Sequence, residues 1–155
     1  MQTQELASFK IEQEIRIRGN QRKVFDFLTQ RVGEWWGAHF LMTKSPKDLK
    51  IELKVGGRVY EDSGGDEGAL WGTVSHLEAP SRLEWRGAMG MSGAITGVVC
   101  FELEAEGDDT LLKLWHWAAG QVTEKQKAGY TFGWKDLTGR LKLLVETGER
   151  KGVKK

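Results

Sequence analysis

His116 is the side chain in this sequence best suited to acid–base chemistry, because an imidazole titrates near neutral pH. It lies in an alternating stretch, residues 110–118, in which Leu112 and Leu114 share its side of the predicted strand. Lys113 lies on the other side, which we therefore expect to face solvent near its start. We predict that His116 points into an apolar pocket, where it could orient a ligand carbonyl or hydroxyl, or exchange a proton. The simpler interpretation is a core histidine that is hydrogen-bonded to neighbouring backbone.

A second group of polar residues lies on the predicted strand at residues 57–63. Arg58 and Tyr60 share one face of this strand, and Glu61 belongs to the other. If the first face points inward, Arg58 and Tyr60 could bind a carboxylate or phenol of a ligand. If the second face points inward, desolvation would raise the pKa of Glu61 and make it a candidate base. The alternation leaves both assignments open, and we expect the outward set to form ordinary cross-strand ion pairs.

Aromatic side chains are the other candidates for ligand contact. The chain has seven tryptophans among 155 residues, more than core packing usually requires. Four of them are candidates for lining an aromatic cavity that suits a flat or ring-containing ligand: Trp36, Trp71, Trp85 and Trp134. The alternative is that the indole rings fill the interior and leave no usable pocket.

Four further residues bear on this choice. Tyr130 shares a helical stripe with Trp134 and is a candidate contact, and His39 follows the tryptophan pair in a loop at the expected pocket mouth. The plainer interpretation of His39 is an exposed loop residue. Two glycines, Gly129 and Gly133, argue against complete filling, because each glycine inside a helix costs about 1 kcal/mol relative to alanine. Close approach of the sheet, or room for a ligand beside Trp134, would offset that cost.

The composition predicts no metal, cofactor or disulfide. The histidines at 39, 76 and 116 have no metal-ligand spacing, and Cys100 is the only cysteine. The alternation of residues 94–104 places Cys100 on the outer face, where we expect an inert thiol in a reducing compartment. His76 is expected on the solvent side of its strand. The sequence also lacks the nucleophile elbow, the phosphate-binding loop and the dinucleotide fingerprint that mark common enzyme classes.

The charge balance excludes a strongly electrostatic partner. Lys plus Arg is 23 and Asp plus Glu is 22, which leaves +1 and gives no case for nucleic acid or an anionic membrane. No apolar segment approaches the length of a membrane span, and the first residues lack a signal-peptide core. We expect one cytoplasmic domain over residues 1–155, a monomer or weak homodimer, with residues 150–155 as a disordered basic tail.

Periodicity predicts the elements that must position these residues. Residues 8–18 alternate as a strand, Asn20 caps the first of two short helices before residue 36, and strands are expected near 50–54, 57–63, 69–78, 81–86, 94–104 and 110–118. Short turns between them favour an antiparallel meander. An amphipathic helix then runs from Thr123 to Gly148, with capping-box spacing between Thr123 and Gln126 and a glycine stop. This order of elements indicates an α+β domain.

Several short strings in this order resemble the START-like, or Bet v 1-like (SRPBCC), superfamily. They are VGGRVY at 55–60, WGTV at 71–74 with APSRLEW at 79–85, TLLKL at 110–114 before His116, GW at 133–134, and the tryptophan pair at 35–36. The branch that they resemble is the C-terminal domain of the activator of Hsp90 ATPase. The resemblance implies a helix-grip fold, in which a curved antiparallel sheet of about seven strands wraps around the C-terminal helix. It also implies a pocket between sheet and helix.

Three functions are compatible with this resemblance. The first is a binding module for a hydrophobic or aromatic small molecule, contacted by His116, Trp134 and Tyr60. The second is an enzyme similar to polyketide cyclases or aromatases, in which His116 or Glu61 moves protons. The third is a protein-interaction domain of the Hsp90-activator kind. That role relies in the family on a second, N-terminal domain that these 155 residues do not contain.

Overall fold

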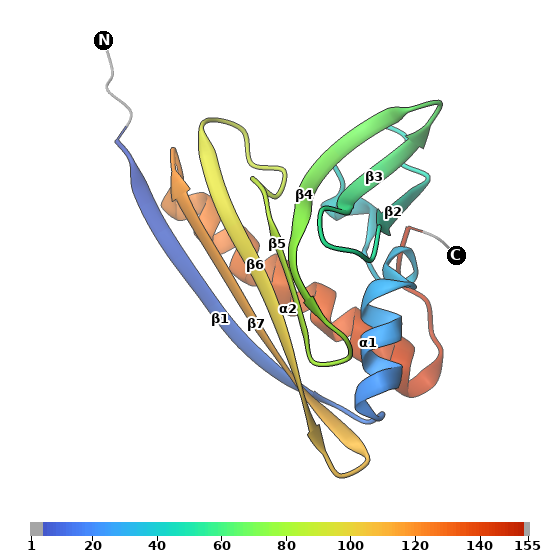
Figure 1. Ribbon diagram of the computed structural model, residues 1–155. Coiled ribbons are helices and arrows are strands. Elements are labelled where there is room, and N and C mark those ends of the chain that lie inside the picture. The colour runs from blue at the N-terminus through green and yellow to red at the C-terminus, as the bar shows by residue number, and fades with distance from the viewer. Residues whose placement is uncertain (1–4, 154–155) are drawn as a thin grey trace.

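A seven-stranded antiparallel sheet and one long helix form the two layers of the structure, a computed structural model that describes residues 5–153 (Figure 1). From the N-terminus the elements are β1 (Ala7–Ile17), α1 (Gln21–Thr29), η1 (Val32–Glu34), η2 (Ala38–Phe40), β2 (Asp48–Ile51), β3 (Arg58–Gly64), β4 (Glu67–Glu78), β5 (Arg82–Arg86), β6 (Ile95–Glu106), β7 (Asp109–Gly120) and α2 (Glu124–Thr147). The predicted helix-grip α+β fold is confirmed.

The strand order is β1-β7-β6-β5-β4-β3-β2, so six consecutive strands form a meander and β1 joins its far edge. β1 pairs with β7, which places Ile11 opposite His116, and β6 pairs with the other side of β7, which places Phe101 opposite Leu114. Since α2 follows β7 directly, the helix returns across the sheet face that carries these residues, as Figure 1 shows. The core lies between these two layers.

The signals predicted at the ends of α2 are confirmed. The Thr123 hydroxyl accepts a hydrogen bond from the Gln126 amide at 3.1 Å, and the Gln126 side chain accepts one from the Thr123 amide at 2.9 Å. Gly148 ends the helix in the left-handed conformation, with φ of 79°. The predicted apolar stripe is buried at Trp134, Leu137, Leu141, Leu144 and Val145. Packing of this stripe, rather than helix propensity, stabilises a helix that contains several glycines.

The region between β1 and β2 differs in detail from the sequence prediction. Asn20 caps α1 as expected, with its side chain accepting from the Lys23 amide at 2.9 Å. The second short helix is a single 3₁₀ turn, Val32–Glu34, and the stretch expected as loop contains another, Ala38–Phe40. Gly33 fits against β2, where an added Cβ would overlap the Asp48 carboxylate. That close approach favours a tight turn in place of a longer helix.

The basic C-terminal segment is not a free tail within the described residues, which corrects the expectation of disorder at 150–155. The Lys151 amide donates to the Glu34 carbonyl at 3.2 Å, and the Val153 amide donates to the Trp36 carbonyl at 2.8 Å. Gly152 is buried between them, where an added Cβ would overlap the Gly33 carbonyl oxygen. Backbone groups make these contacts, so the charge pattern of the sequence could not reveal them. Residues 154 and 155 lie outside the described residues.

Gly152→Val should therefore lower the free energy of unfolding by about 1–2 kcal/mol, because it removes two backbone hydrogen bonds worth about 1 kcal/mol each. Urea unfolding measures the difference. Lys151→Ala is the control: among the described residues its ammonium pairs with exposed Glu149, at 3.1 Å, and its backbone bond is kept. Equal stabilities for the two variants would show that docking of this segment contributes nothing.

A cavity between the sheet and helix α2

A cavity of about 540 Å³ lies beside the sheet-facing side of α2. Three parts of the chain form its wall: the N-terminal half of α2, the segment from Trp36 to Met42, and β4 with the loop after β5. Its lining residues are Trp36, His39, Phe40, Leu41, Met42, Trp71, Met89, Gly90, Thr123, Lys125, Gln126, Gly129, Tyr130, Gly133, Trp134 and Leu137. Most of these side chains are apolar, so the cavity favours an apolar occupant.

Three indole rings from different elements meet at the wall. The ring centroid of Trp36 lies 5.7 Å from that of Trp71 on β4 and 5.6 Å from that of Trp134 on α2, both in edge-to-face geometry. Edge-to-face contacts of this kind favour fixed ring positions. The cavity therefore has a pre-formed aromatic wall, to which three of the four candidate tryptophans contribute.

Trp85, the fourth candidate, does not line the cavity. Its ring lies 5.4 Å from that of Phe101 on the neighbouring strand, and its indole nitrogen donates to the Met89 sulfur at 2.9 Å. Only 1 % of its surface is exposed. The expectation that Trp85 lines the cavity is corrected, because this side chain packs in the core against Phe101 and Met89.

The two glycines of α2 have different surroundings. An added Cβ at Gly133 would lie 3.3 Å from the Phe40 ring, so this glycine allows close approach of the loop after α1, not of the sheet. An added Cβ at Gly129 would meet nothing within 4 Å, although Gly129 lines the cavity. The absence of a side chain at Gly129 therefore leaves part of the cavity open.

His116 lies behind the aromatic wall, fully buried, and is absent from the cavity lining. Its Nδ1 accepts a hydrogen bond from the Trp134 indole at 2.9 Å, so the proton of the neutral ring is on Nε2, which has no partner within the described residues. Burial lowers the pKa of His116 to about 4, and the ring is neutral at physiological pH. The expected core histidine is present, but its partner is an indole rather than backbone. It holds Trp134 in place.

The ring of Tyr130 lines the cavity, and its hydroxyl is already hydrogen-bonded. The hydroxyl donates to the Met89 carbonyl, and burial raises the pKa of Tyr130 to about 12. The ring packs edge-to-face with His116 at 5.6 Å. Tyr130 is therefore an apolar contact for an occupant rather than a free donor.

The buried face of β3 carries Glu61, which is not exposed at all. Burial by itself would raise the pKa of Glu61, but four donors outweigh it and hold the pKa below its usual value. Thr43 donates its hydroxyl at 2.6 Å and its amide at 2.7 Å, the Met42 amide donates at 2.6 Å, and the Trp71 indole donates at 3.0 Å. The expectation of a raised pKa is wrong. Glu61 is an ionised anchor that fixes the Met42 wall segment, and not a poised base.

Arg58 and Tyr60 lie on the outer face of β3, which corrects their placement in the pocket. The Arg58 guanidinium pairs with Glu52 at 2.8 Å and lies 4.3 Å above the Tyr60 ring. This pairing lowers the pKa of Glu52 to about 2. The burial of Glu61 fixes the strand parity, because neighbouring positions point to opposite faces. The outward set forms the ion pair expected for it.

His39 lies at the mouth of the cavity and is also exposed, with 60 % of its side chain accessible. Its ring packs on Phe40 at 4.1 Å, and its Nε2 lies 3.9 Å from the Asp136 carboxylate. Phe40, Met42 and the other wall residues from loops were not singled out from the sequence. Loops lack a periodicity that would indicate which way their side chains point.

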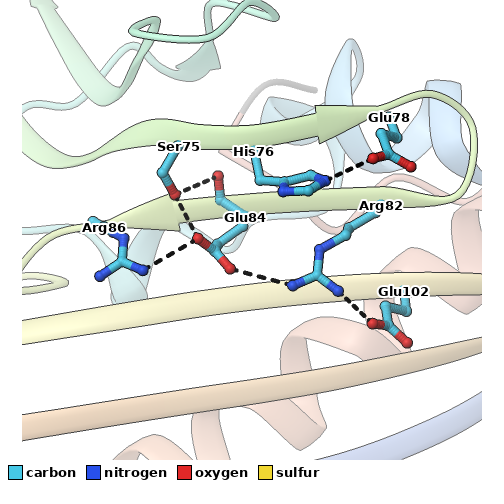
Figure 2. Close-up of polar contacts among 7 residues, drawn as sticks. All are labelled: Ser75, His76, Glu78, Arg82, Glu84, Arg86 and Glu102. Carbon is cyan, nitrogen blue, oxygen red and sulfur yellow. Dashed lines mark hydrogen bonds and ion pairs between the residues drawn. The ribbon is translucent and has the colours of Figure 1, made fainter.

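On the opposite face of the sheet, polar side chains of β4, β5 and β6 pair with one another (Figure 2). Arg82 on β5 donates to Glu102 on β6 at 2.6 Å, and Ser75 on β4 donates to Glu84 on β5 at 2.8 Å, so these contacts link three strands. His76 pairs with Glu78 at 3.0 Å on the solvent side, as predicted. The charged side chains in these contacts therefore pair with one another. The cavity on the other face is the candidate functional site.

Cys100 lies on the outer side of β6 but is buried, and burial raises the pKa of its thiol to about 11. Such a thiol is protonated and a poor nucleophile. Among residues 5–153, no group of three His, Cys, Asp or Glu side chains is placed to hold a metal ion. None of the helices in this part of the chain combines the length and apolar character needed to cross a bilayer.

A long C-terminal helix on a seven-stranded antiparallel sheet, with a cavity beside it, defines a helix-grip domain of the SRPBCC, or Bet v 1-like, superfamily. Within that class, the chain belongs to the family described as activator of Hsp90 ATPase homolog 1-like protein, whose model matches residues 19–146. The resemblance stated from the sequence is therefore confirmed. A sequence comparison with curated proteins gave no match.

Solved structures show the same fold at low identity. DynU16, a protein of the dynemicin biosynthetic locus, superposes with a TM-score of 0.71 at 21 % identity, over 92 % of this chain and 49 % of its own, so this chain spans about half of it. The Aha1 dimer from Colwellia psychrerythraea has a TM-score of 0.66 at 20 % identity, over 90 % of this chain and 98 % of its own. CalU16 from Micromonospora echinospora has a TM-score of 0.63 at 22 % identity, over 94 % and 85 %. Identities this low show a shared fold alone.

Proposed function

We propose that this protein binds an apolar or aromatic small molecule in the cavity between the sheet and α2. The observation that carries the proposal is the unfilled volume of about 540 Å³ beside Gly129, faced by the indoles of Trp36, Trp71 and Trp134. Volumes of about 300–1,000 Å³ are typical of small-molecule sites. A helical glycine that leaves a cavity open reduces helix stability without improving packing, and a ligand supplies the missing contacts.

Binding is favoured over acid–base catalysis by the position of the two candidate catalytic residues. His116 is behind Trp134, and Glu61 has its carboxylate engaged by four donors. A general acid or base must come within hydrogen-bond distance of the reacting group. One structurally similar protein belongs to a biosynthetic locus, which suggests a polyketide cyclase or aromatase reaction as an alternative. That reaction would need a different residue at the cavity as its general acid or base. The protein-interaction alternative rests on the family description and on no residue of this chain.

Gly129→Phe should weaken binding of the neutral aromatic probe 1-N-phenylnaphthylamine at least tenfold, because the new ring occupies the open space beside Trp134. Probe fluorescence gives the Kd, and quenching of the wall tryptophans gives a second readout. The same titration against flavonoids, fatty acids and polyketides would rank the ligand classes.

Gly139→Phe is the matched control, since Gly139 is also on α2 with nothing within 4 Å of an added Cβ, but lies outside the cavity. Both variants replace a helical glycine and should unfold no more easily than the parent protein. Equal affinities in Gly129→Phe, Gly139→Phe and the parent would contradict binding in this cavity.

A further inference from the structure

We infer that the occupant of this cavity is an amphipathic anion, an apolar or aromatic body with one acidic group that lies beside Lys125. This inference rests on the proposed function and specifies its ligand class. Within residues 5–153, no Asp or Glu lines the cavity, and Lys125 and His39 are the only side chains of its lining that can carry charge. The charge-bearing side chains of the lining itself are therefore all basic, which favours an anion over a cation beside Lys125.

Lys125 has no competing carboxylate among residues 5–153. No carboxylate of the described residues lies within ion-pair distance of its ammonium group, whereas His39 faces Asp136 at 3.9 Å. Lys125 is exposed at the N-terminal turn of α2, where water still reaches a charged group. An anion beside it keeps part of its hydration and avoids the large penalty of a buried, unpaired charge.

Three of the four polar side-chain groups of the inner wall are already engaged. The Tyr130 hydroxyl donates to Met89, and the indole nitrogens of Trp71 and Trp134 donate to Glu61 and His116. The Trp36 indole nitrogen has no partner within residues 5–153, but it is buried and does not reach the open space. A ligand group that needs hydrogen bonds must therefore stay near the mouth, and the inner wall suits hydrocarbon or an aromatic ring.

Glu61 sets the orientation. Its ionised carboxylate lies directly behind Met42 and Trp71, since it accepts hydrogen bonds from the backbone of the first and the indole of the second. That part of the wall repels an anion, while Lys125 attracts one at another part, on α2. The geometry points to a ligand whose apolar body packs on Trp71 and Met42 and whose acidic group faces the start of α2.

Two probes that share one ring system isolate this charge effect. 8-Anilinonaphthalene-1-sulfonate and 1-N-phenylnaphthylamine have the same anilinonaphthalene rings, and only the first carries a sulfonate. We expect the parent protein to bind the sulfonate probe more tightly, with an affinity that falls as NaCl is raised. Lys125→Glu should weaken binding of the sulfonate probe about tenfold and binding of the neutral probe less than twofold.

Lys135→Glu makes the same charge change on the same helix outside the cavity and should leave both affinities unchanged. Displacement of the neutral probe by decanoate, but poorly by decanol, would extend the result from a sulfonate to a carboxylate. The inference is overturned, and the proposed function stands, if Lys125→Glu changes the affinity of neither probe. The same holds if Lys135→Glu changes the affinity of the sulfonate probe as much as Lys125→Glu does. If Gly129→Phe leaves the neutral probe bound as before, the proposed function itself fails.

Discussion

Trp134→Ala is expected to lower the free energy of unfolding by about 3–5 kcal/mol, the range measured when large buried aromatic side chains are truncated. Trp134 is 2 % exposed and contacts the rings of Trp36, Phe101 and His116 at centroid distances of 5.6, 5.9 and 5.9 Å. Its removal enlarges the cavity and leaves both nitrogens of His116 without a partner. Urea unfolding followed by circular dichroism measures the loss without relying on tryptophan emission.

Two further variants separate the contributions to this loss. Trp134→Phe keeps most of the ring packing but leaves His116 Nδ1 unpaired in the core, which should cost about 1–3 kcal/mol. Trp117→Ala truncates an indole of the outer face that is 39 % exposed, and should cost less than about 1 kcal/mol. If Trp134→Ala were no more destabilising than Trp117→Ala, Trp134 could not be the side chain that joins helix, sheet and cavity wall.

Acidification from pH 6.5 to pH 4 should remove roughly 3 kcal/mol of stability through His116 alone. Burial lowers the pKa of the folded histidine to about 4, whereas an unfolded histidine titrates near 6.5. The unfolded chain therefore takes up the proton first. The contribution is complete above pH 6.5 and is lost as the pH falls through the folded pKa. Urea unfolding at half-unit steps of pH gives the slope.

His116→Phe should reduce this slope sharply between pH 6.5 and 4.5, whatever its effect on stability at pH 7. Carboxylates with lowered pKa values, such as Glu61, add their own slope near the lower limit, where the unfolded chain begins to take up protons on them, but they add it equally to the parent and to the variant. A double variant of the two exposed histidines, His39→Gln with His76→Gln, keeps the buried His116 and is the control for histidine replacement. Retention of the slope in His116→Phe would show that another group titrates in this window.

The fold was predictable because every long element has its own periodicity. The alternation of β7 placed His116 on the buried face, and Thr123, Gln126 and Gly148 marked the ends of α2. The aromatic wall was partly predictable for the same reason, since Trp71 and Trp134 lie on a strand and a helix whose buried faces the pattern reveals. Trp36 was found through its local string, without a periodic element around it.

The rest of the site depends on contacts that a one-dimensional pattern does not contain. Both parities of β3 were chemically acceptable, and Glu61 points inward because the amides of Met42 and Thr43, from a distant loop, meet its carboxylate. The pKa of Glu61 followed from those donors and not from its burial. Trp85 was misplaced because alternation shows which face a side chain occupies, but not whether that face meets core or cavity.

The docking of residues 151–153 against the Trp36 segment makes the two ends of the described chain unequal as attachment points. Figure 1 shows the start of β1 and the C-terminal segment on opposite sides of the molecule. A biosensor tether attached at the C-terminal side of Val153 would apply force to the backbone that carries Trp36, because the Val153 amide is hydrogen-bonded to the Trp36 carbonyl. Immobilisation through the β1 end would leave that backbone unloaded, so affinities measured on a chip should come from protein held there.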